Sequence, residues 1–194
     1  MRPVTPATPA TAGVPERFSS VGQLLAVMDA HGDWPEEDGL TFREHALQCG
    51  EALALARPDD PELQAAGLVH DVGYLLDHDA DETHPALGAR MVGNLLGERV
   101  AWLVRHHVAA KRYLVTVDRA YRDVLSTVSA RNLALQGDVL SGEERAALEA
   151  SPDLDAVLAL RRADDAAKVP DAQLPHPTPG LDTWRPVLER LARG

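Results

Sequence analysis

Apolar residues recur three and four positions apart through most of the chain, whereas runs that alternate apolar and polar residues are nearly absent. The first spacing places apolar side chains on one face of a helix, and strict alternation is typical of a strand. The pattern therefore predicts an all-α fold. The expected helices cover residues 21–30, 42–56, 61–76, 84–96, 98–107, 120–125, 142–150, 154–167 and 182–192.

Two of these helices have clear start signals. Thr41 and Glu44 have the spacing of a capping box, which predicts that the second helix begins directly after Thr41. Asp60 followed by Pro61 supplies an N-cap and a first-turn proline for the third helix. The proline-rich segment 170–179 predicts an irregular arm before the last helix.

Length and composition predict one domain. A chain of 194 residues with 45% hydrophobic content can bury one sizeable core. We expect this domain to cover residues 18–194 after a disordered tail at residues 1–17, whose first part is rich in Pro, Thr and Ala. The tail lacks the apolar run of a signal peptide, and no segment reaches the ~20 apolar residues that span a bilayer.

The charge balance limits the kinds of partner that the protein can bind, and the cysteine content indicates its cellular compartment. The chain has 19 Lys and Arg against 30 Asp and Glu, a net charge of −11, which argues against nucleic acid or an anionic membrane as a partner. A small anionic substrate stays open, because a few cations in a pocket matter more than the overall balance. Cys49 is the only cysteine, which fits a reducing compartment, and we expect a cytoplasmic protein.

The adjacent residues His70 and Asp71 are the first sign of chemistry. They lie in an apolar run in the second half of the predicted helix 61–76. Burying an unpaired carboxylate costs several kcal/mol, and a metal ion removes that cost; a hydrogen-bonded His–Asp pair in the core is the alternative. Further candidate ligands are His45, His84, Asp164 and one of the doublet His106 and His107, between which spacing does not choose.

The size of this set indicates a dinuclear metal centre. Four His and two Asp exceed the three or four protein ligands of a typical zinc site, and a carboxylate such as Asp71 can bridge two ions. Mixed imidazole and carboxylate ligands suit iron and borderline divalent metals. His31, His78 and His176 lie in polar or irregular segments, and we expect them on the surface.

The order His45, His70-Asp71, His84, His107, Asp164 resembles that of the HD-domain superfamily. The resemblance extends from about residue 39 to the end of the chain. It is closest to the phosphonate-cleaving HD-domain oxygenases, including those that act on 2-amino-1-hydroxyethylphosphonate. The runs that carry it are 44–49 (EHALQC), 107–114 (HVAAKRYL), 133–137 (LALQG), 164–170 (DDAAKVP) and 184–186 (WRP).

The resemblance implies a single HD-domain helical bundle with a mixed-valent Fe(II)/Fe(III) pair bridged by Asp71. It implies that O₂ is the co-substrate, that the carbon–phosphorus bond of a small phosphonate is broken, and that His107 is the ligand of the doublet. Lys111 and Arg161 match phosphonate-contacting positions. Asp71, as the bridging ligand, and Lys111, as a substrate contact, would therefore be the catalytic residues. Ser129 and Asn132 would complete the substrate pocket.

Other interpretations of these polar residues stay open. Lys111 and Arg161 share a helical face with a ligand if their segments are helical, yet each could form an ordinary surface ion pair. Turn or cap chemistry would explain Ser129 and Asn132 equally well. Gln48 could support the site or lie on a helix surface.

Two positions depart from the family. Tyr74 stands where the aminohydroxyethylphosphonate enzymes usually have a His that helps to position the substrate, so Tyr74 would be a substrate-binding residue and the substrate could differ. Packing between helices would also explain a Tyr here. Asp38 falls where the family carries a Glu that occupies the open iron site before substrate arrives, although Glu36 and Glu37 compete for this role. Trp34 could replace a nearby family Tyr. Finally, Lys168 is expected to pair with Asp164 or Asp165.

Two other functions compete with the oxygenase. A metal-dependent phosphohydrolase acting on a nucleotide or phosphate monoester would use the same six ligands, with metal-bound hydroxide as its nucleophile. A non-catalytic binding module would be expected to lose one or more of those ligands. Lys111, Arg161 and the residues around them favour the oxygenase.

Overall fold

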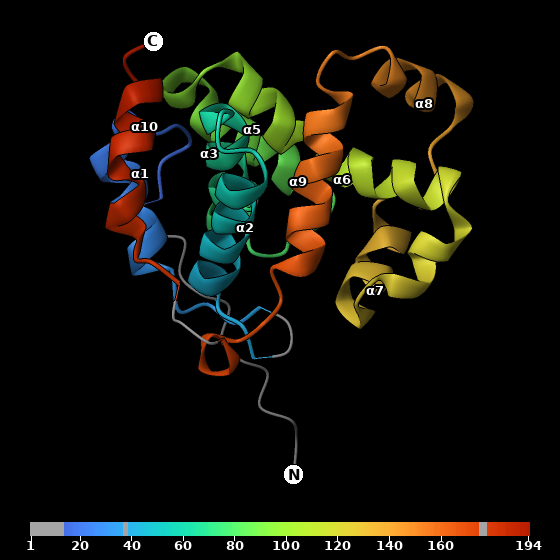
Figure 1. The fold of residues 1–194 in the computed structure, drawn as a ribbon, viewed down its shortest axis with the longest axis horizontal. Coiled ribbons are helices and arrows are strands. Elements are labelled where there is room, and N and C mark those ends of the chain that lie inside the picture. The colour runs from blue at the N-terminus through green and yellow to red at the C-terminus, as the bar shows by residue number, and fades with distance from the viewer. Residues whose placement is uncertain (1–13, 37–38, 175–177) are drawn as a thin grey trace.

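The computed structural model describes residues 14–36, 39–174 and 178–194, and within these ranges the chain is helical (Figure 1). The described residues contain no β-strand beyond an isolated bridge between Pro35 and Thr41, so the all-α prediction is confirmed. The expected tail lies mostly at residues 1–13, outside the described residues. The elements are α1 Val21–Ala30, α2 Phe42–Ala56, α3 Pro61–Val69, α4 Gly73–Leu76, α5 His84–Leu96, α6 Glu98–Val117, η1 Arg119–Val124, α7 Thr127–Leu135, α8 Gly142–Glu149, α9 Leu154–Ala166, η2 Asp171–Gln173, η3 Leu181–Trp184 and α10 Arg185–Leu191.

Helices α2, α3, α6 and α9 form the centre of the bundle. Helix α2 packs against α3 and α9, and α6 packs against α3, α5 and α9 (Figure 1). Helices α1 and α10 lie together on one side of this group, whereas α7 and α8 lie on the opposite side (Figure 1). Fully buried apolar side chains fill the space between the central helices, among them Leu63, Leu68, Val104 and Leu160. No helix within the described residues has the length and apolar character to cross a membrane.

The predicted start signals form as expected. The Thr41 hydroxyl accepts a hydrogen bond from the Glu44 N–H at 3.2 Å, and the Glu44 carboxylate accepts one from the Thr41 N–H at 2.7 Å. The Asp60 carboxylate accepts from the Leu63 N–H at 3.1 Å, with Pro61 in the first turn of α3. Both caps satisfy amide groups that would otherwise be unpaired at a helix start, which is why these boundaries are readable in the sequence.

The predicted single helix 61–76 is wrong. Helix α3 ends at Val69, residues 70–72 form a turn, and α4 begins at Gly73. Gly73, the first residue of α4, packs tightly on the start of α5, where a Cβ atom on Gly73 would lie 2.0 Å from the His84 carbonyl oxygen. His70 and Asp71 therefore lie in the turn between two helices, where the His70 ring is fully buried and the Asp71 carboxylate lines the cavity, 3.2 Å from His70 Nε2.

Replacing Gly73 with alanine should lower the free energy of unfolding by roughly 2–4 kcal/mol, because the new methyl group collides with backbone that cannot yield cheaply. Urea denaturation followed by circular dichroism would measure the change. Gly142→Ala is the matched control, since a Cβ atom there meets nothing within 4 Å. Equal stability of the two variants would contradict the close approach of α4 and α5.

Other boundaries also differ from the predictions. Helix α6 was expected to end at residue 107 but continues to Val117, the segment 120–125 is the 3₁₀ helix η1, and the last helix is divided into η3 and α10. Helix α7 was not predicted. Only Ser129 and Leu133 of α7 are buried, so its sequence carries almost no apolar period.

Candidate metal centre

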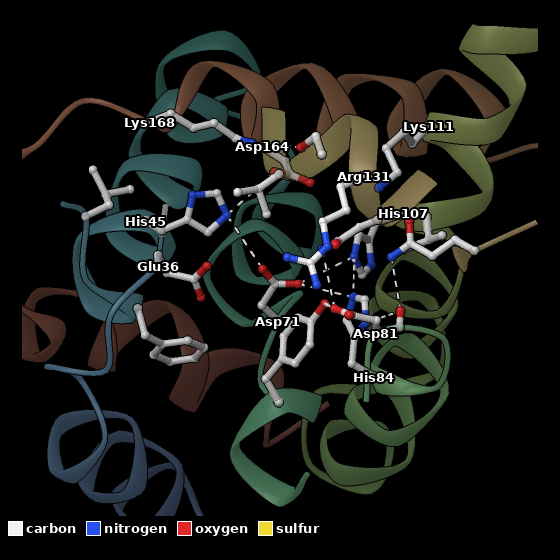
Figure 2. A pocket seen from close by; sticks show the side chains of 18 of the residues that line it. Glu36, His45, Asp71, Asp81, His84, His107, Lys111, Arg131, Asp164 and Lys168 are labelled. Atoms are coloured by element: carbon white, nitrogen blue, oxygen red, sulfur yellow. Dashed lines mark hydrogen bonds and ion pairs between the residues drawn. The ribbon is translucent and has the colours of Figure 1, made fainter. Parts of the chain in front are cut away.

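Six side chains from five parts of the chain converge, and all of them except the fully buried His70 line one cavity (Figure 2). They form two groups, and within each group one ligand atom per residue lies within 4.8 Å of the others. The first group is His45 of α2, His70 of the turn and Asp164 of α9; the second is Asp71 of the turn, His84 of α5 and His107 of α6. The sequence hypothesis named these same six residues.

Backbone carbonyl groups orient all four imidazole rings. The Nδ1 atom of each ring lies within hydrogen-bond distance of a carbonyl oxygen, which requires that Nδ1 carries the proton and donates it. The Nε2 lone pairs are then free to bind a cation. The distances are 2.7 Å from His45 to Ala167, 2.8 Å from His70 to Gly67, 3.0 Å from His84 to Asp81 and 2.7 Å from His107 to Val104.

The Nε2 atoms face one another in pairs. They lie 3.2 Å apart between His45 and His70, and 3.1 Å apart between His84 and His107. Two imidazole lone pairs at such distances repel each other unless a cation lies close to both of them. With carboxylates beside both pairs, the donor set fits a metal ion in each group.

Asp71 connects the two groups. Its Oδ2 atom lies 3.2 Å from Nε2 of His70 and 3.6 Å from Nε2 of His45. Its Oδ1 atom lies 3.4 Å from Nε2 of His84 and 3.5 Å from Nε2 of His107. One carboxylate oxygen therefore faces each histidine pair, an arrangement suited to bridging two ions.

Arg161 fixes the second carboxylate. Its buried guanidinium donates to Asp164 at 2.7 Å, to Asp165 and, through Nε, to the Tyr121 hydroxyl at 3.1 Å. Burial raises the pKa of Asp164, but the effect of its charged surroundings, the Arg161 guanidinium first among them, outweighs this and holds that pKa well below its usual range. Asp164 is therefore ionised at neutral pH.

A cavity of about 320 Å³ opens above the two groups. It is lined by all five residues that sequence reasoning placed around the substrate: Tyr74, Lys111, Ser129, Asn132 and Arg161. Lys111 is only 3% exposed, and burial, assisted by the Arg161 charge, lowers its pKa to about 8. A buried ammonium group in a cavity that also holds donors such as Ser129 is suited to bind an anion.

Asp81 organises the opposite wall, and sequence reasoning did not find it. Its Oδ1 atom accepts hydrogen bonds from the Tyr74 hydroxyl at 3.0 Å and from the Asn132 amide at 3.3 Å. The Tyr74 ring also stacks on His84, with centroids 4.1 Å apart. Burial first, and then the charges of Asp71 and Asp81, raise the pKa of Tyr74, so its phenol is neutral at physiological pH.

Three sequence expectations need correction. Lys168 does not pair with Asp164 or Asp165; its ammonium donates to Ser126 at 3.1 Å and Ser129 at 2.9 Å because α7 lies opposite it. His78 is not a simple surface residue, since it lines the cavity beside Trp34 and has a buried Nδ1 atom with no hydrogen-bond partner in the described part of the chain. His31 is half-buried against the same Trp34 ring.

The remaining candidates are placed as follows. His106 lies outside both groups, because its ring stacks on Trp102 with centroids 4.2 Å apart. Gln48 is buried and exchanges two hydrogen bonds with the backbone of Val169, so it holds the chain after α9. Glu36 and Trp34 line the cavity. Three further candidates, Glu37, Asp38 and His176, lie outside the described residues.

The helical bundle and its paired histidine–carboxylate groups define an all-α protein with two groups of side chains that can hold metal ions. The model of the HD domain matches residues 40–167, and the chain belongs to the HD-domain family. It is 32% identical over 188 residues to the 1-hydroxy-2-(trimethylamino)ethylphosphonate dioxygenase (glycine-betaine-forming) of Leisingera caerulea, covering 90% of this chain and 91% of the relative. It is 33% identical over 164 residues to the hydroxymethylphosphonate dioxygenase of Gimesia maris, covering 80% and 81%. The resemblance to the phosphonate-cleaving HD-domain oxygenases is confirmed.

Proposed function

We propose that the protein is an O₂-dependent oxygenase that uses two iron ions, as an Fe(II)/Fe(III) pair, to break the carbon–phosphorus bond of a hydroxylated phosphonate. The main support is Asp71, whose two oxygens face separate histidine pairs beneath a cavity that contains a buried cation. The two relatives named as phosphonate dioxygenases support the reaction class.

Each group of side chains would hold one ion. His45, His70 and Asp164 would bind the first, His84 and His107 the second, and Asp71 both. Bound iron supplies the redox chemistry that O₂ activation needs and the positive charge that stabilises an ionised substrate hydroxyl. The backbone carbonyls behind the rings keep the four Nε2 atoms facing one another in pairs, and Arg161 keeps the Asp164 carboxylate ionised and fixed.

The cavity wall would bind and orient the substrate. The Lys111 ammonium, the Arg161 guanidinium and the Ser129 hydroxyl are suited to phosphonate oxygens, which carry the substrate's negative charge. Tyr74 and Asn132 lie against Asp81 and would shape the space for the rest of the substrate. Because its phenol stays neutral, Tyr74 would act by hydrogen bonding and by shape.

Hydroxymethylphosphonate provides the simplest balanced reaction. One phosphonate dianion and one O₂ give formate, hydrogen phosphate and one proton. The carbon–phosphorus bond breaks, the carbon is oxidised from the alcohol to the carboxylate level, and O₂ is reduced with both of its oxygen atoms retained in the products. No further oxidant or reductant is required.

The iron-loaded protein should consume one O₂ for each phosphate released from the correct hydroxylated phosphonate. An oxygen electrode and a phosphate assay, applied to hydroxymethylphosphonate and its longer 1-hydroxyalkyl relatives, measure this ratio. Electron paramagnetic resonance after limited oxidation should show a mixed-valent signal that changes when the substrate is added. Phosphate release that proceeds equally well without O₂ would contradict the proposal and indicate the metal-dependent phosphohydrolase.

A further inference from the structure

Arg131 of α7 lines the cavity, although no sequence pattern marks it as a site residue. Its guanidinium reaches over the cavity toward Asp71 and His107, as Figure 2 shows. The side chain is exposed, and it forms no hydrogen bond or ion pair with any other residue that the structure describes. The Arg131 guanidinium, with its N–H donors available, therefore lies over the cavity that the convergent side chains line.

The other cations of the cavity are held in place by partners or by burial. Arg161 is already bound to two carboxylates, Asp164 and Asp165, which offset its charge. Lys168 donates to the hydroxyls of Ser126 and Ser129. Lys111 contributes one ammonium group. A phosphonate has three oxygens that share close to two negative charges near neutral pH, as phosphate esters do, so an oxygen that faces the open side of the cavity would need a donor there.

From the position of its guanidinium over the cavity we infer that Arg131 is a further substrate-binding residue, which binds phosphonate oxygens from the open side. The planar guanidinium presents parallel N–H donors that fit two oxygens of a tetrahedral oxyanion. This inference rests on the proposed function, because the oxyanion is the phosphonate of the substrate. If the inference holds, the open side of the cavity binds a negatively charged group of the ligand.

The position of Arg131 also makes the inference easy to test. Since the side chain is exposed and has no partner among the described residues, its removal leaves no buried carboxylate unpaired and creates no cavity in the core. Arg131→Ala should therefore keep the fold and the thermal stability of the parent protein. The exposed location also allows a small guanidinium compound to enter the space that the substitution leaves.

In the iron-loaded enzyme, Arg131→Ala should raise KM for hydroxymethylphosphonate about 10- to 100-fold, the effect of losing one charge-assisted contact. The Kd of methylphosphonate, which lacks the reacting hydroxyl, should rise in parallel by calorimetry, while kcat changes by less than about 3-fold. Methylguanidine in solution should recover part of the lost affinity in Arg131→Ala. The matched control is Arg162→Ala on α9, because Arg162 is exposed and does not line the cavity.

The outcomes separate this inference from the proposed function. If the parent enzyme turns over hydroxymethylphosphonate and Arg131→Ala keeps both KM and the methylphosphonate Kd within about 2-fold, the inference is overturned and the oxygenase stands. If methylphosphonate binding depends on Arg131 but no O₂ is consumed with any hydroxylated phosphonate, the oxygenase fails and the anion-binding role stands. Absence of methylphosphonate binding to the parent protein, or loss of affinity that methylguanidine does not relieve, overturns the inference as well.

Discussion

Replacing Asp71 with alanine is expected to reduce iron content from two ions per chain to one and to lower oxygenase activity by at least about 1,000-fold. Without Asp71, the group of His84 and His107 retains only two imidazole ligands, fewer than the three protein ligands common in catalytic metal sites. The group of His45, His70 and Asp164 keeps three and should still hold an ion. Elemental analysis of the purified protein, together with O₂ consumption, measures both effects.

Asp79→Ala is the control for this experiment, since Asp79 is an exposed carboxylate between α4 and α5 that does not line the cavity. It should leave both iron content and activity unchanged. An Asp71→Ala protein that retains two irons and full activity would show that the carboxylate does not bridge them. Loss of both irons would instead show that Asp71 is also required by the group that contains Asp164.

The helices that sequence reasoning placed best are those with local start signals and a strong apolar period. Helices α2 and α5 have their predicted bounds, and α2 is fixed by its capping box. The break after Val69 was missed because apolar residues continue through it to Leu76, whereas the close packing of Gly73 on the His84 backbone is a tertiary contact that no local pattern encodes. Helix α7 was missed because so little of it is buried, which leaves packing on its neighbours, not periodicity, to determine its place.

The residues of the candidate site also fall into those that the sequence identified and those that it did not. The six convergent His and Asp residues stand out because such groups are costly to bury without a partner, and their order in the chain matches a known family. Asp81, Tyr121 and Arg131 could not be identified, since single residues of these types are ordinary on a surface and only the fold brings them to the cavity. The partner of Lys168 was wrong because helical spacing proposed a local ion pair, whereas α7 supplies two hydroxyls.

Replacing Lys111 with methionine is expected to weaken phosphonate binding about 100-fold while iron content stays at that of the parent protein. The Lys111 ammonium is buried in the cavity one helical turn beyond His107, and it forms no ion pair with any residue that the structure describes. Its charge is therefore available to the substrate. Methionine keeps much of the apolar stem, so the packing of α6 should change little.

Calorimetry with methylphosphonate and elemental analysis measure the two quantities. Unchanged affinity would remove Lys111 from the substrate site, and loss of iron together with affinity would indicate a role in building the metal centre instead.

The pH dependence of binding gives a second, independent test of Lys111. Burial, with the Arg161 charge beside it, lowers the Lys111 pKa to about 8, so the ammonium is charged below that pH and neutral above it. Phosphonate binding should therefore weaken as pH rises from about 7 to about 9, whereas Lys111→Arg keeps its charge across this range. Because titration of the ligand itself affects both proteins equally, the ratio of their Kd values isolates the lysine. A ratio that stays constant over this range would show that the charge on Lys111 does not hold the substrate.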